Sequence, residues 1–143
     1  MPLNITIDGP VGAGKSSVAD AIAKKLSILH LDTGAMYRAF AYYCVKKGIS
    51  VEDEAAVAEI IDDVEISVEF CDGKQKTLLN GVAVDDFIRT PEISMAASTV
   101  SKMGIVREKL VNEQRKIAKT RDMILEGRDI GTNVLTDAEV KIF

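Results

Sequence analysis

Short apolar runs and amphipathic stretches alternate in the first third of the chain. Residues 3–7 form a short β-prone run, and a glycine-rich turn follows them. Apolar residues then recur at helical spacing over residues 18–26, which predicts a helix with an apolar stripe. Residues 28–31 are a second candidate for a buried strand, and a second helix is expected over residues 35–47. This order predicts a parallel sheet with helices on its faces.

The pattern becomes more polar after Gly48, which is well placed to end the second helix. Ser50 and Asp53 have the spacing of a capping box, with Asp in place of the usual Glu. We therefore expect a third helix that is capped at Ser50, with its apolar face formed by Val57, Ile60 and Ile61.

Alternating apolar and polar positions over residues 64–70 are typical of a β-strand. The turn signals Asp72-Gly73 and Asn80-Gly81 enclose a further β-prone run at residues 76–79. Residues 64–88 are therefore predicted to form a small antiparallel β insert.

Helical character returns after this insert. Thr90 and Pro91 are typical of the N-cap and first position of a helix, and a longer helix is expected over residues 105–119. Two more short buried-strand candidates cover residues 123–125 and 140–143. Because the chain stops inside the last of these strands, with no helix to cover it, we expect its C-terminal part to be missing.

The composition is that of an ordinary folded domain. Of the 143 residues, 47% are hydrophobic, 28% are charged and only three are proline, which excludes a disordered or collagen-like chain. A chain of this size buries about 68% of its unfolded surface. We expect a single domain over residues 1–143, with the β insert inside it.

Net charge and targeting features exclude several functions. The 18 Lys and Arg against 22 Asp and Glu give a net charge of −4, which disfavours binding to a nucleic-acid polymer. No basic leader or long apolar run precedes the first strand, so we expect a cytoplasmic protein that does not bind membranes. Cys44 and Cys71 lack CxxC spacing and are expected to be reduced. His30 is the only histidine, and we interpret it as a packed or rim residue.

The glycine-rich turn matches the phosphate-binding motif G-x-x-x-x-G-K-[ST] and lies between a predicted strand and a predicted helix. Its backbone N–H groups and the helix N-terminus suit phosphate oxygens. We expect Lys15 to reach the β- and γ-phosphates of ATP, and the hydroxyl of Ser16 to ligate Mg²⁺. The predicted ATP-phosphate site consists of Gly9, Pro10, Val11, Gly12, Ala13, Gly14, Lys15, Ser16 and Ser17.

Charged residues at the ends of other predicted strands complete a candidate site. Glu126 follows the strand at residues 123–125, where a carboxylate that supports Mg²⁺ is expected, although a solvated glutamate is the alternative. Arg38 and Arg128 each lie shortly after a predicted strand, at the edge where open α/β sheets bind ligands. Arginine offers charged, bidentate donors, so both are candidates to hold the phosphate of an acceptor.

Several motifs make the chain resemble the bacterial cytidylate kinase family of P-loop nucleoside monophosphate kinases, from Ile5 to Phe143. They are Ile7-Asp8-Gly9-Pro10 with the P-loop, Asp32-Thr33-Gly34-Ala35-Met36-Tyr37-Arg38, Ile88-Arg89-Thr90-Pro91-Glu92, Ala97-Ser98, Val106-Arg107-Glu108, Gln114-Arg115, and Glu126-Gly127-Arg128-Asp129-Ile130-Gly131-Thr132. The resemblance implies a P-loop NTPase-type α/β fold. It also implies phosphorylation of CMP and dCMP by ATP with Mg²⁺.

The resemblance assigns roles to individual residues. It implies that Arg38 and Arg128 hold the CMP phosphate. Lys15 and Arg128 are expected to be catalytic, because their charges suit stabilisation of the phosphoryl group during transfer. The resemblance implies further that cytosine is read by Ser98, Arg107 and Asp129. Asp and Arg side chains complement the amino donor and ring acceptors of cytosine and mismatch uracil.

Some alternatives stay open. Asp32 and Thr33 are assigned to the CMP site, but they are also suited to cap the second helix. Relatives in this family continue through an arginine-bearing lid and an adenine-binding segment, and the complete enzyme is expected to be a monomer. The chain as given is therefore either a kinase or a non-catalytic nucleotide-binding fragment. A P-loop kinase for another small acceptor is a further alternative.

Overall fold

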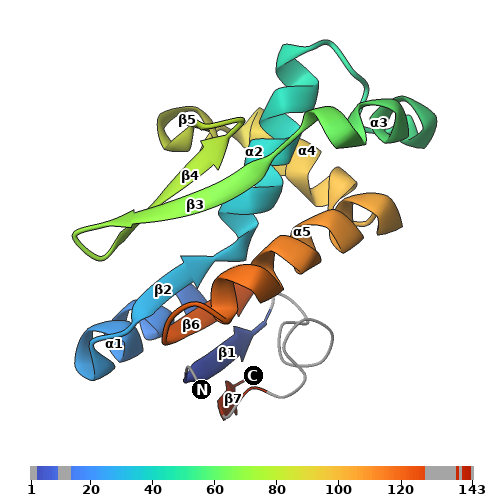
Figure 1. Ribbon diagram of the computed structural model, residues 1–143. Coiled ribbons are helices and arrows are strands. Elements are labelled where there is room, and N and C mark those ends of the chain that lie inside the picture. The colour runs from blue at the N-terminus through green and yellow to red at the C-terminus, as the bar shows by residue number, and fades with distance from the viewer. Residues whose placement is uncertain (1–2, 10–13, 128–137, 139, 143) are drawn as a thin grey trace. The chain divides into compact units, whose positions relative to one another are not determined.

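The structure is a computed structural model that describes residues 3–9, 14–127, 138 and 140–142 (Figure 1). Short 3₁₀ helices cover Ile61–Asp63 and Asp85–Phe87. In chain order the main elements are β1 (Asn4–Asp8), α1 (Lys15–Leu26), β2 (Leu29–Asp32), α2 (Thr33–Lys46), α3 (Glu54–Ile60), β3 (Ile66–Cys71), β4 (Lys74–Leu79), β5 (Val82–Ala83), α4 (Pro91–Val100), α5 (Gly104–Ala118), β6 (Met123–Gly127) and β7 (Val140–Ile142).

The chain divides into two compact units. The first comprises Met1–Thr33, Phe70–Gln75 and Gln114–Phe143, and the second comprises Gly34–Glu69 and Lys76–Glu113. Helices α2 and α5 therefore contribute residues to both units.

A four-stranded sheet in the order β2-β6-β1-β7 forms the framework of the first unit. Its strand pairs are all parallel, so the carboxyl ends of β1, β2 and β6 lie at the same edge. The register pairs Glu126 on β6 with Ile7 on β1 and with Asp32 on β2. The predicted parallel α/β sheet is thus confirmed, and Glu126 lies on a strand that adjoins the strand before the P-loop.

Helix α1 packs against β1, β2 and β6 of this sheet, as Figure 1 shows. The contact is an apolar cluster in which Ala19 and Ala23 of the helix meet Ile5, Ile7 and Ile124 of the strands. Small side chains at positions 19 and 23 let the helix approach the sheet closely. The apolar stripe is narrower than predicted, because Val18 and Leu26 are 47% and 49% exposed.

Strands β3, β4 and β5 form a second, three-stranded sheet. Asp72 and Gly73 have φ angles of 53° and 79°, and Asn80 and Gly81 have angles of 49° and 83°. Consecutive positive φ angles define type I′ turns, whose twist suits two-residue hairpins. The predicted antiparallel β insert is therefore confirmed, with its turns at the two predicted dipeptides.

The second unit contains α3 and α4, whose starts are fixed by side-chain caps, and it has buried apolar side chains of its own. Thr90 caps α4 as predicted, since its Oγ1 accepts a hydrogen bond from the N–H of Ile93 at 3.2 Å. The largest fully buried apolar side chains of this unit include Phe40, Met36, Ile88, Leu110, Val57, Val64 and Val100.

The expected cap of the third helix at Ser50 is wrong. Asp53 is the N-cap of α3, and its Oδ1 accepts from the N–H of Ala56 at 3.2 Å. Ser50 instead lies in the preceding turn, where its carbonyl accepts from the N–H of Asp53. The same Ser and Asp side chains that suit a capping box also suit consecutive turns, so their spacing alone did not fix the start of the helix.

Candidate active site

The ends of β1 and α1 position the phosphate-binding motif. Strand β1 ends at Asp8 and α1 begins at Lys15, as the motif requires. Gly14 is the N-cap of α1 and has a φ angle of 77°, a left-handed conformation that glycine adopts without strain. Because the first turn of α1 has no acidic residue, its N-terminal partial positive charge is not offset there.

Part of the predicted ATP-phosphate site lies outside the described residues. Pro10, Val11, Gly12 and Ala13 belong to this part, and the side chains of Lys15 and Ser16 are likewise not described. Gly9 and Gly14 bracket the loop, and Ser17 is exposed in the first turn of α1. The predicted strand before the motif and the predicted helix after it are therefore present, and the phosphate contacts of these residues stay a prediction.

Carboxylates gather at the edge of the sheet where β1, the strand before the P-loop, ends. Asp8 and Glu126 are 5% and 3% exposed, and both lie at the carboxyl ends of adjacent parallel strands. Asp32 ends β2 on the other side of Glu126. The surroundings of Glu126 differ from the solvated alternative, because this side chain is buried and hydrogen bonded.

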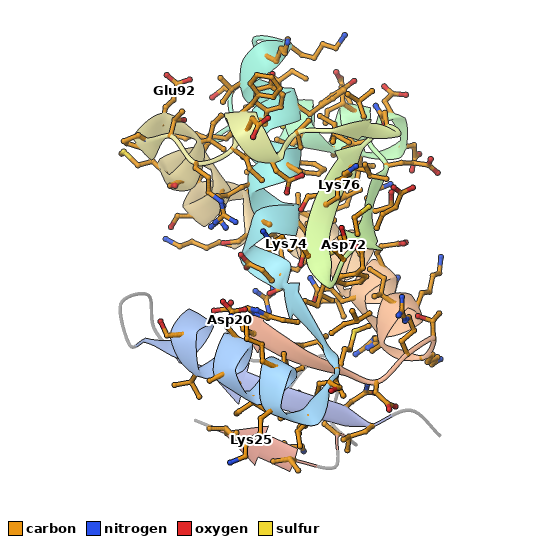
Figure 2. The ribbon with its side chains drawn as sticks, turned by 90° about the vertical axis from the view of Figure 1, so that its left-hand side faces the viewer. Asp20, Lys25, Asp72, Lys74, Lys76 and Glu92 are labelled. Atoms are coloured by element: carbon orange, nitrogen blue, oxygen red, sulfur yellow. The ribbon has the colours of Figure 1, made fainter. Side chains whose placement is uncertain are left out.

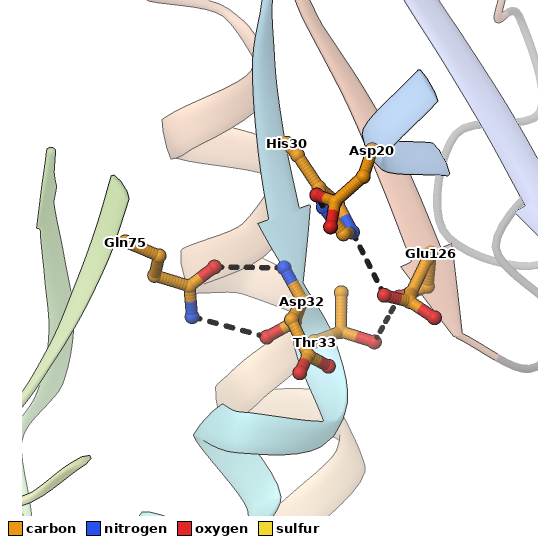
Figure 3. Close-up of polar contacts among 6 residues, drawn as sticks. All are labelled: Asp20, His30, Asp32, Thr33, Gln75 and Glu126. Carbon is orange, nitrogen blue, oxygen red and sulfur yellow. Dashed lines mark hydrogen bonds and ion pairs between the residues drawn. The ribbon is translucent and has the colours of Figure 1, made fainter. Parts of the chain in front are cut away.

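His30 on β2 lies between two carboxylates from other elements (Figure 3). Its Nε2 is 2.7 Å from Oε1 of Glu126, and its Nδ1 is 2.6 Å from Oδ1 of Asp20 on α1. Ionised carboxylates only accept hydrogen bonds, so both contacts are satisfied together when both ring nitrogens carry a proton. The expectation of a packed or rim histidine is correct for its location, but it did not include these partners.

The surroundings of His30 also alter its acid–base behaviour. Burial on its own lowers the pKa of the imidazole, but the hydrogen bonds to Glu126 and Asp20 and their negative charges raise it. The net result is a pKa above the ordinary value of 6.5. In the protein without metal, the imidazole therefore keeps its proton to a higher pH than in the unfolded chain.

Two further contacts fix the end of β2 beside Glu126. The hydroxyl of Thr33 donates to the carbonyl oxygen of Glu126 at 2.9 Å. The side-chain amide of Gln75 bonds both backbone groups of Asp32, accepting from its N–H at 2.7 Å and donating to its carbonyl at 3.2 Å (Figure 3). Thr33 thus ties the start of α2 to β6, and Gln75 holds the backbone of Asp32.

The predicted CMP residues fall on both units. Asp32 and Thr33 belong to the first unit, and Arg38, Ser98 and Arg107 belong to the second. Arg128 and Asp129 lie outside the described residues.

Within the second unit, the turn between α4 and α5 links Ser98 and Arg107. Nη1 of Arg107 donates to the carbonyl of Ser101 at 3.3 Å, and Oγ of Ser101 donates to the carbonyl of Ser98 at 3.0 Å. Ser101 therefore connects the backbone carbonyl of Ser98 to the guanidinium of Arg107 through two hydrogen bonds.

The donor set at the sheet edge fits Mg²⁺ bound together with nucleotide phosphates. Mg²⁺ prefers oxygen ligands, and in such sites it uses one or two protein oxygens plus phosphates and waters. Glu126 offers a buried carboxylate, and Ser16 offers a hydroxyl in the first turn of α1. Across the described part of the chain, no group of three or more His, Cys, Asp and Glu residues is arranged as a metal cage. This chemistry agrees with a metal that arrives with ATP.

The residues that sequence reasoning missed are Asp20, His30 and Gln75. Their contacts depend on strand register and on the packing of α1 and β4, which no local motif encodes. For His30, the only available signal was a polar side chain within an otherwise apolar strand.

A parallel sheet in this order, with a glycine-rich loop between its β1 strand and the following helix, defines a P-loop NTPase-type α/β protein. The cytidylate kinase family model matches residues 5–143. The chain therefore belongs to the cytidylate kinase family. In the described residues, the helices lack the length and apolarity that crossing a membrane requires.

Curated relatives agree with this assignment. The chain is 48% identical over 141 residues to the cytidylate kinase of Caldicellulosiruptor bescii, and equally so to that of Caldicellulosiruptor saccharolyticus. It is 45% identical over 141 residues to the cytidylate kinase of Bacillus thuringiensis. These alignments cover 99% of this chain but only 62% or 63% of each relative.

Proposed function

We propose that this protein is a kinase that transfers the γ-phosphoryl group of ATP to the 5′-phosphate of CMP or dCMP. The observation that carries this proposal is the family match over residues 5–143. The parallel sheet supports it, because acidic residues lie at the edge where the strands end, next to the start of the P-loop. Open α/β sheets bind their ligands at this edge.

On the donor side, Gly9 to Ser17 surround the phosphates of ATP. Lys15 balances the charge on the β- and γ-phosphates. Ser16 and Glu126 hold Mg²⁺, which supplies further positive charge to the transferred phosphoryl group when bound. The location of Glu126 beside β1 supports this assignment.

On the acceptor side, Arg38 and Arg128 hold the CMP phosphate, and Asp32 and Thr33 contribute from the end of β2. In the proposed reaction, an oxygen of this phosphate attacks the γ-phosphorus, and the bond from that phosphorus to the bridging oxygen of ADP breaks. The acceptor phosphate is mostly deprotonated at pH 7, since its second pKa is about 6. A general base is therefore not required, and the arginines and Lys15 offset the negative charge of the transition state.

Base recognition is assigned to Ser98, Arg107 and Asp129. A carboxylate suits the N4 amino group of cytosine, and a guanidinium suits its N3 and O2 acceptors. The hydrogen-bonded turn that links Ser98 to Arg107 supports a shared role for these two residues.

The proposal is tested by measuring ADP formation from ATP and Mg²⁺ with CMP, dCMP, UMP or AMP, with Lys15→Ala as the blank. Selective ADP formation with CMP and dCMP supports it, and equal rates with UMP or AMP contradict it. Titration calorimetry with CMP and UMP separates binding from turnover. Binding of CMP without ADP formation would favour the non-catalytic alternative.

ATP and CMP or dCMP are the small-molecule partners, and we extend the proposal to a monomer that works in the cytoplasm, where these nucleotides are found. Light scattering after size-exclusion chromatography tests the oligomeric state, and a dimer mass would contradict it.

A further inference from the structure

His30, Asp20 and Glu126 come from β2, α1 and β6, and all belong to the first unit. His30 lies opposite Ile124 in the register of the parallel strands, two residues before Glu126 on β6. Since side chains two apart on a strand share a face, Glu126 lies on the same face as Ile124, which packs against α1. The side chains of Asp20, His30 and Glu126 therefore form a hydrogen-bonded series near the carboxyl edge of the sheet (Figure 3).

Glu126 forms a close polar contact with His30. Its side chain is only 5% exposed, and a buried carboxylate is costly unless it is hydrogen bonded. Glutamate also has three rotatable side-chain bonds, so burial alone does not fix the direction of its carboxylate. The contact from Nε2 of His30 to Oε1 holds one oxygen of the carboxylate at 2.7 Å and so restricts the orientation of the other.

Asp20 in turn fixes the imidazole. Its Oδ1 lies 2.6 Å from Nδ1 of His30, so both ring nitrogens are engaged and rotation of the ring would break both contacts. Asp20 itself is 62% exposed, which means that its side chain is not needed to fill the core. Its position on α1, the helix that follows the P-loop, connects the phosphate-binding helix to Glu126 through a single side chain.

We propose that His30 is a positioning residue, oriented by Asp20, that holds the carboxylate of Glu126 in the geometry in which it binds Mg²⁺ together with ATP. The inference rests on the proposed function. His30 acts through Glu126 and does not touch the transferred phosphoryl group. Partners of this kind typically change metal affinity by about 10- to 100-fold when they are removed.

The test compares His30→Leu and His30→Gln with the wild-type chain. Leucine removes the donor to Glu126, whereas glutamine keeps an N–H donor. Binding of Mn²⁺, used as a probe for Mg²⁺, is measured by electron paramagnetic resonance in the presence of ATP. We expect His30→Leu to weaken Mn²⁺ binding by about tenfold and His30→Gln to recover most of it. ATP binding in EDTA should change by less than about twofold, because the inference concerns the metal ligand alone.

A matched pair on α1 keeps the test valid if His30→Leu does not fold. Asp20→Ala should weaken Mn²⁺ binding several-fold, whereas Lys25→Ala should leave it unchanged. Lys25 is exposed, and Figure 2 shows it on the opposite side of α1 from Asp20. Thermal unfolding of each variant confirms that binding is compared between folded proteins.

The NMR signals of the His30 ring give a further test, because a residue that only stabilised the fold would not respond to the metal. The chain has a single histidine, so its ring signals in NMR are unambiguous. We expect Mg²⁺ added to the ATP complex to shift these signals more than ATP does alone.

Unchanged Mn²⁺ affinity in folded His30→Leu or Asp20→Ala overturns the inference, and so does equal loss of ATP binding with and without metal. Failure of the wild-type chain to form ADP with CMP would instead contradict the proposed function. Because metal binding and CMP-driven turnover are measured separately, the two failures are distinguishable.

Discussion

The two cysteines differ sharply in their surroundings. Cys44 on α2 is fully buried, and burial raises the pKa of its thiol to about 11. Cys71 at the end of β3 is exposed. Since the thiolate is the reactive form, we expect a disulfide reagent at about pH 8 to modify Cys71 rapidly and Cys44 only on unfolding. The absorbance of the thiolate that the reagent releases reports the number of reacted thiols. Rapid reaction in Cys71→Ser would contradict this prediction.

The histidine between two carboxylates predicts a pH dependence of stability in the metal-free protein. The folded pKa of His30 is raised above 6.5, so the folded protein binds this proton more tightly than the unfolded chain. The resulting stabilisation is fully present below the unfolded pKa and is lost as pH rises through the folded pKa. We expect wild-type protein to lose more free energy of unfolding than His30→Gln between about pH 6 and pH 9. Urea denaturation at both pH values checks this, and equal losses would contradict it.

At the scale of single elements, the corrected cap of α3 gives a direct comparison. Asp53 caps the helix and Ser50 does not, so Asp53→Ala should lower the free energy of unfolding by about 1 kcal/mol. Ser50→Ala is the matched control and should cost clearly less, because its Oγ only accepts a long bond from Glu52 at 3.3 Å. Chemical denaturation of both variants measures the difference. A larger loss in Ser50→Ala would restore the cap expected from the sequence.

The elements that the sequence predicts well are those with strong local signals. The hairpin turns at Asp72-Gly73 and Asn80-Gly81 and the cap at Thr90 are determined by side chains within a few residues. The cap of α3 was misplaced because Ser50 and Asp53 both suit a helix start. The contact between His30 and Glu126 joins residues 96 apart in the sequence, so only the register of β2 with β6 determines it.

At the scale of the molecule, ligand binding should stabilise the folded chain. A ligand that binds only the folded state at about 100 times its Kd adds about 2.7 kcal/mol to the free energy of unfolding. We expect ATP with Mg²⁺ to raise the unfolding midpoint, and Lys15→Ala to remove most of this increase. Differential scanning calorimetry measures both, with CMP and UMP added in separate experiments. An equal rise in Lys15→Ala would contradict the assigned role of the P-loop lysine.

The order of the strands also has a consequence for how the protein is made. Strands β1 and β2 are synthesised early, but neither pairs with the other, because β6 occupies the place between them. Residues as distant as Leu3 and Met123 must meet before this sheet exists. Contacts of such long sequence separation slow folding. On the ribosome, the proposed nucleotide site therefore cannot assemble until β6 has left the exit tunnel. Until then, β1 and β2 must stay soluble without the strand that pairs with both of them.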